Sequence, residues 1–125
     1  MLTIKDINKL LALHRFIAET KFIASMDNPV GDGGGYIADI ARENLQAIIE
    51  FYESNNKQDD ANSWKEWMIL TKKSVAYKRI LERIKLQDRW HSFDEERRKK
   101  ILLEWAAPYE VSDSLLAEML NMIEN

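Results

Sequence analysis

Apolar residues recur at three- and four-residue steps along most of this chain, a spacing that places them on one face of an α-helix. No segment of convincing length alternates between apolar and polar residues with period two, as a half-buried strand would. The sequence therefore predicts an all-α fold. Five helices are expected, at about residues 4–26, 36–54, 64–90 and 93–107, and from 113 through 123.

Residues that favour helix starts and loops stand between these segments. Thr3 precedes the first helix, and Ser63 and Ser92 each begin a Ser-x-x-Glu capping box. All four glycines lie between Asp27 and Gly35, which predicts a loop. The stretch 64–90 contains neither Gly nor Pro, so one long central helix of about 40 Å is expected there, although its continuity stays open.

Length and composition suit one ordinary globular domain. The chain has 125 residues, of which 46% are hydrophobic and 31% charged, and we expect a single helical domain over 1–125. No window approaches 18 consecutive apolar residues and no signal peptide is visible, so no membrane association is expected. The absence of cysteine agrees with a reducing compartment, and a cytoplasmic location is the simplest expectation.

Positive charge is concentrated in one block of the chain. Residues 65–100 hold 12 of the 18 Lys and Arg but only 6 of the 21 Asp and Glu. The block is therefore near +6, whereas the rest of the chain is near −9. Such segregation predicts a charge-polarised surface on which a macromolecular partner could bind.

A helical projection of the long third helix separates two apolar faces. The larger faces the predicted core, and the smaller is bordered by cations on both edges. We interpret the smaller face as a partner-binding surface. An arginine of the fourth helix is added to it because its helical direction falls among apolar residues. Its candidate residues are Trp64, Met68, Lys72, Val75, Lys78, Arg79, Arg83, Lys85 and Arg98.

Two alternatives to that surface stay open. The third helix could be central, packed on two sides, with its Lys and Arg stems extending past their neighbours to solvent. A partner of opposite charge could instead bind an acidic surface elsewhere in the molecule. The residues of this alternative acidic surface are Glu50, Glu53, Asp59 and Asp60.

Motifs for catalysis, metals and cofactors are missing from the sequence. The glycine-rich run Gly31–Gly35 lacks the Lys and Ser or Thr of a phosphate-binding loop, and is interpreted as a turn. His14 and His91 have no partner at metal-ligand spacing. We therefore expect no metal, no cofactor and no catalytic residues, and predict that the protein is not an enzyme.

Nucleic-acid binding is one function that the basic 65–100 segment suggests, because phosphates and bases bind cations and aromatic rings. The net charge of −3 and the pI near 5.4 weaken this reading, since dedicated nucleic-acid-binding domains are usually basic. Residues 101–125 contain five acids and no Lys or Arg, which argues against a recognition helix there.

Protein binding fits the sequence better. In size and character the chain is similar to the small helical inhibitors of bacterial conflict systems, such as toxin-immunity proteins, antitoxins and phage anti-defence proteins. That resemblance rests on general character and transfers no functional residues. We expect a non-enzymatic protein that binds and inhibits or regulates another protein, a toxin or defence effector for example. The alternatives are a nucleic-acid-binding regulator and a small homodimeric structural or adaptor protein.

Overall fold

The computed structural model describes residues 6–23, 34–87 and 89–122, and these residues fold into six α-helices with no strand among them. The prediction of an all-α fold is confirmed. The helices are α1 (Ile7–Ala18), α2 (Gly34–Ser54), α3 (Gln58–Trp67), α4 (Val75–Leu86), α5 (Glu95–Ala106) and α6 (Asp113–Met122). A π-helical turn, η1 (Glu19–Ile23), extends α1, and a 3₁₀ turn, η3 (Trp90–Ser92), separates α4 from α5.

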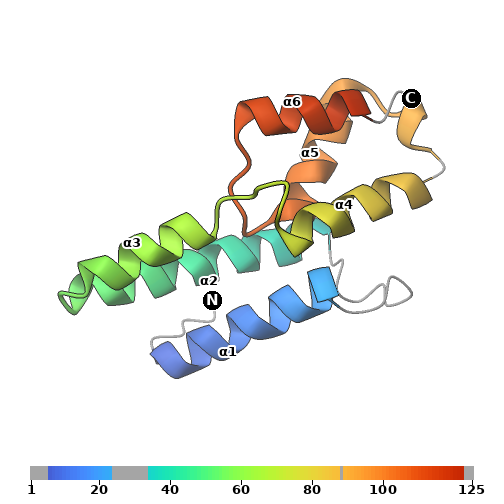
Figure 1. The fold of residues 1–125 in the computed structure, drawn as a ribbon. Coiled ribbons are helices and arrows are strands. Elements are labelled where there is room, and N and C mark those ends of the chain that lie inside the picture. Colours follow the sequence, from blue (N-terminus) through green and yellow to red (C-terminus); the bar gives the residue numbers. More distant parts are fainter. Residues whose placement is uncertain (1–5, 24–33, 88, 123–125) are drawn as a thin grey trace.

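The helices form two groups around α2. Figure 1 shows α1 antiparallel to α2, with α3 folding back along the C-terminal part of α2. The last three helices, α4 to α6, gather at the other end of the molecule, where α5 contacts α2 and η1 contacts α4. The turn between α2 and α3 contains Asn56 at a φ of 58°, a left-handed conformation that Asn tolerates better than most residues.

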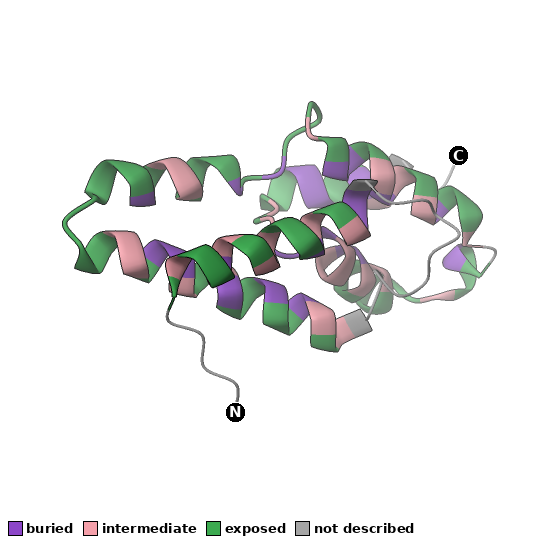
Figure 2. Cartoon of the chain, turned by 90° about the horizontal axis from the view of Figure 1, so that it is seen from below, coloured by how far each residue is buried: buried purple, intermediate pink, exposed green. Residues whose placement is uncertain are grey.

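Most of the core lies among α4, α5, α6 and η1. Its largest fully buried side chain is Trp90, which stacks on Trp105 with ring centroids 5.7 Å apart. Ile80 of α4, Leu102 of α5 and Met119 of α6 close around it. Figure 2 shows the buried positions gathered on the facing sides of the helices, with exposed positions along their outer sides. This cluster fixes which side of α4 faces solvent.

The predicted 64–90 helix is wrong, because the structure contains two helices in its place. The first, α3, begins earlier, at Gln58, where Asp59 and Asp60 favour the N-terminal turn through the helix dipole. It ends at Trp67, and α4 begins only at Val75. No local sequence signal marks this break, since neither Gly nor Pro lies within it.

Long-range backbone hydrogen bonds explain the break. Leu70 donates its N–H to the carbonyl of Glu110, and Glu110 donates its own to the carbonyl of Met68, at N···O distances of 2.9 and 2.7 Å. These groups cannot then bond within a helix. The bridge also buries Met68 and Leu70, so tertiary packing overrides local helix propensity here.

The remaining predicted boundaries are close to those observed. Asp6 caps α1, accepting a 2.8 Å hydrogen bond from the N–H of Asn8, whereas the predicted cap Thr3 lies outside the described residues. The end of the predicted 4–26 helix and the glycine-rich loop also lie largely outside them. Asp94, and not the predicted Ser92, caps α5 by accepting from the N–H of Arg97, and Ser112 caps α6 by accepting from the N–H of Leu115.

Candidate partner-binding face

The outer side of α4 presents two exposed apolar residues between cations. Val75 and Leu86, at its two ends, are 62% and 66% exposed. Lys78 and Lys85, which are both exposed, lie along one edge of the stripe that joins them at 100° per residue. The opposite side of α4 is buried. We call Val75, Lys78, Glu82, Lys85 and Leu86 the α4 outer face.

Arg79 and Arg83 lie at the other edge of α4, where both bond to η1. The Nε of Arg79 donates to the carbonyl of Phe22 at 3.0 Å, and the Nη2 of Arg83 donates to the carbonyl of Lys21 at 2.8 Å. Arg79 also pairs with Glu82 at 3.0 Å. Carbonyls at the end of a helix lack intrahelical donors, so the two guanidinium groups supply them. These two predicted binding residues therefore hold the structure together.

The predicted residues from α3 and the following turn divide in the same way. Met68 is buried, at 8% exposed. Trp64 is half-buried, with its ring edge-on to His14 and to Trp67 at centroid distances of 5.0 and 5.6 Å. Lys72 is exposed and pairs with Glu118 of α6 at 3.1 Å. Of this group, only Lys72 reaches solvent as the sequence reasoning expected.

Arg98 and the acidic surface lie away from the α4 outer face. Arg98 is half-buried on α5. The four acids of the alternative surface are all exposed, at the end of α2 and the start of α3. Glu53 pairs with Lys65 at 3.3 Å. The structure therefore brings the four acids to the tip of the α2–α3 hairpin, apart from the basic side of α4. They are Glu50, Glu53, Asp59 and Asp60.

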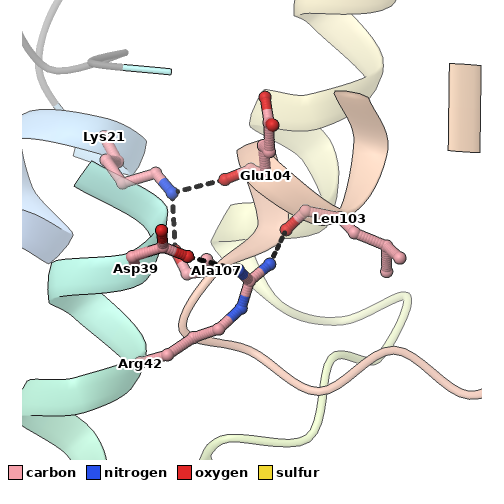
Figure 3. Close-up of polar contacts among 6 residues, drawn as sticks. All are labelled: Lys21, Asp39, Arg42, Leu103, Glu104 and Ala107. Carbon is pink, nitrogen blue, oxygen red and sulfur yellow. Dashed lines mark hydrogen bonds and ion pairs between the residues drawn. The ribbon is translucent and has the colours of Figure 1, made fainter. Parts of the chain in front are cut away.

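Sequence reasoning missed Lys21, which is only 1% exposed. Its Nζ donates to the carbonyls of Glu104 and Ala107 at 2.8 and 2.6 Å, as Figure 3 shows. Arg42 of α2 donates to the neighbouring carbonyl of Leu103 at 3.1 Å. Two cations from separate helices thus cap the C-terminal end of α5. A π-helical turn at Lys21 has no clear sequence signal, so this role could not have been predicted.

An open cleft of about 410 Å³ lies beside this cap, between the start of α2 and α5. Its wall carries charges of both signs: Asp39 and Glu104 are acidic, and Arg42 and Lys100 are basic. Arg42 already bonds to Asp39 and to the end of α5. Its guanidinium therefore belongs to the structural cap, and the cleft adds no chemistry to the α4 outer face.

His14 links the first and third helices through its contact with Trp64. Burial lowers the pKa of His14 below its usual value of 6.5 because the charged imidazolium loses solvation. The unfolded chain then binds more protons than the folded chain in the interval below pH 6.5, so acidification through this interval destabilises the fold. The stability that neutral His14 supplies is present above pH 6.5 and is lost as the pH falls towards the lowered pKa.

We therefore expect the urea midpoint to fall between pH 7 and pH 5.5 in the wild type, and to fall less in the His14→Gln variant. Circular dichroism across this pH range measures both midpoints. His91→Gln removes the second histidine, which is exposed, and serves as the matched control. Parallel curves for the wild type and His14→Gln would show that another group carries the effect.

No helix among the described residues is both long and apolar enough to cross a bilayer. The same residues include no cluster of three or more His, Asp or Glu side chains arranged to hold a metal ion. No family model, curated protein or solved structure matches the chain.

Proposed function

We propose that this protein binds an acidic protein partner through the α4 outer face and inhibits or regulates that partner by covering its surface. The observation that carries the proposal is the exposure of Val75 and Leu86 on the same face as Lys78 and Lys85. Exposed apolar residues among cations supply both contact area and attraction to an anionic surface. A toxin or defence effector is the kind of partner this proposal envisages.

The hydrogen bonds of the arginines support a role for the lysines in binding and for the arginines in structure. Because Arg79 and Arg83 hold η1, the face presented to solvent is fixed by bonds at its edge. The helix that carries the lysines is held in place before a partner binds, so the ordering cost of binding falls on the side chains alone. Lys72 and Lys73, exposed in the turn before α4, extend the positive region.

Nucleic acid is the second candidate partner, because the same lysines could bind phosphates. One feature favours protein. The exposed apolar side chains of Val75 and Leu86 gain nothing from contact with a charged phosphate backbone. A protein partner can match a mixed apolar and cationic surface, since protein interfaces combine an apolar centre with a charged rim.

The test compares affinity capture from the native host by three forms of the protein. The wild type and the Lys57→Glu/Lys65→Glu control, whose changes lie at the two ends of α3, should recover the same partner. The Lys78→Glu/Lys85→Glu variant carries the same change in net charge and should lose it. Biolayer interferometry with the identified partner should then show the association rate falling at least several-fold between about 50 and 500 mM salt. Salt in this range screens the electrostatic attraction that steers association.

Equal recovery by both double variants would overturn the proposal, as would an association rate that ignores salt. Recovery that disappears after nuclease treatment would overturn it in favour of nucleic acid.

A further inference from the structure

A second group of exposed apolar side chains lies on the opposite group of helices. Phe16 of α1 is 66% exposed, and Tyr36 and Ile40 of α2 are 86% and 43% exposed. The proposed binding of an acidic partner uses none of them. Three large apolar residues grouped on the surface of a small protein require an explanation, because contiguous exposed apolar area usually marks an interaction site.

The register of α1 against α2 brings these residues to one level. The two helices are antiparallel (Figure 1), and the Nδ2 of Asn44 donates to the carbonyl of Leu10 at 3.0 Å. Phe16 is six residues beyond Leu10, so it lies level with the residue six before Asn44. That residue is Ala38, midway between Tyr36 and Ile40.

Helical geometry also places the three side chains on one side of the helix pair. On a helical projection of α2, Asn44 points towards α1, and rotation about the helix axis from the buried Ala41 past Asn44 reaches first Ile40 and then Tyr36. On α1, rotation in the same sense from the buried Ile17 passes Leu13 and then reaches Phe16. Because the helices run in opposite directions, both displacements lead to the same outer surface. Figure 2 shows exposed positions along both helices, which lie side by side.

Charges of both signs lie beside these residues. Lys9 and Glu43 are both exposed, and the same helical projection puts them on this outer surface, Lys9 about two turns from Phe16 and Glu43 about one turn from Ile40. Asp39 and Arg42, which form an ion pair with each other, line a cleft together with Tyr36. We call Phe16, Tyr36, Ile40, Lys9 and Glu43 the α1–α2 outer patch.

We propose that the α1–α2 outer patch is the interface of a two-fold symmetric homodimer. In a two-fold interface the same patch of both copies meets. If one residue contacts a second residue of the partner, that second residue contacts the first residue of the partner in return. A patch with one Lys and one Glu satisfies this condition, because Lys9 of each copy can meet Glu43 of the other. The α4 outer face satisfies it less well, since it carries two lysines and one glutamate.

The area of the patch fits a dimer that depends on concentration. A whole aromatic side chain buries about 150–250 Å², so the three exposed apolar side chains offer on the order of 400 Å² per copy. Two copies with their polar neighbours then approach the ~1,200 Å² at the lower end of stable interfaces. The α1–α2 outer patch shares no residue with the α4 outer face.

Sedimentation equilibrium of the purified chain over a concentration range tests the proposal without any partner. The wild type should rise from the 14.7 kDa of one chain towards twice that mass. Phe16→Ser/Tyr36→Ser should remain monomeric while its circular dichroism matches the wild type, because both side chains are already exposed. Val75→Ser/Leu86→Ser removes two equally exposed apolar residues from α4 and should dimerise like the wild type.

A charge exchange tests the two-fold arrangement itself. Lys9→Glu should weaken the dimer at least several-fold because it places two carboxylates together twice, and Lys9→Glu/Glu43→Lys should restore it. A wild type that stays monomeric up to millimolar concentration would overturn the proposal. So would a Phe16→Ser/Tyr36→Ser variant that still dimerises, or a dimer that the α4 substitutions abolish. None of these results bears on the capture experiment, which tests the α4 outer face.

Discussion

Replacing Lys21 with methionine is expected to lower the free energy of unfolding by roughly 2–4 kcal/mol. Methionine retains the length and much of the apolar stem of lysine, so packing changes little. The loss comes from the carbonyls of Glu104 and Ala107, which now accept hydrogen bonds from the Nζ at 2.8 and 2.6 Å. A buried acceptor deprived of its donor keeps its desolvation cost without compensation.

Urea unfolding followed by circular dichroism measures this loss. Lys65→Met is the matched control, because Lys65 is exposed and makes a single ion pair with Glu53 at 3.3 Å. Its removal should cost about 0.5 kcal/mol or less, as surface ion pairs usually do. If the two methionine variants unfold at the same urea concentration, the capping of α5 by Lys21 contributes nothing to stability and its role in the fold is wrongly assigned.

The second large effect is expected at Trp90, where substitution by alanine should cost about 3–5 kcal/mol. Trp90 is 1% exposed, stacks on Trp105 and lies edge-on to Phe93 at 6.4 Å. Alanine leaves a cavity where α4, α5 and α6 meet. Trp90→Phe should cost markedly less, because it keeps an aromatic ring and removes a buried indole N–H that has no hydrogen-bond partner among the described residues.

The order of the variants is the decisive measurement. Urea midpoints should fall in the sequence wild type, Trp90→Phe, Trp90→Ala, with Trp67→Ala close to the wild type because Trp67 is 61% exposed. Circular dichroism is the appropriate signal, since each substitution alters tryptophan fluorescence directly. A Trp90→Phe variant as unstable as Trp90→Ala would mean that the indole N–H is satisfied and makes a necessary bond.

The helical class of the fold could be predicted because the apolar periodicity and the loop residues agreed. The apolar stripes of α2 and α5 are local signals, readable within a few residues, whereas the capping boxes predicted at Ser63 and Ser92 were wrong, since Ser63 lies inside α3 and Asp94 caps α5. The break between α3 and α4 is not local. It depends on Glu110, some forty residues later in the chain, accepting from Leu70 and donating to Met68. A sequence read in windows contains no trace of that partner.

The candidate site was predictable to the same extent. Periodicity placed Val75, Lys78 and Lys85 on one face, and the structure exposes all three there. It could not separate Arg79 and Arg83 from the lysines, because a side chain's partner depends on which helix end packs beside it. Here that end is η1, a π-helical turn whose carbonyls need donors.

The main-chain bridge between the α3–α4 turn and the segment before α6 determines which positions there tolerate substitution. Both of its hydrogen bonds join main-chain atoms, so they do not depend on which side chains occupy these positions. Ile69 and Glu110, which form the bridge, are exposed. Substitutions at the two positions can therefore alter the surface chemistry beside α4 while the main-chain bridge persists.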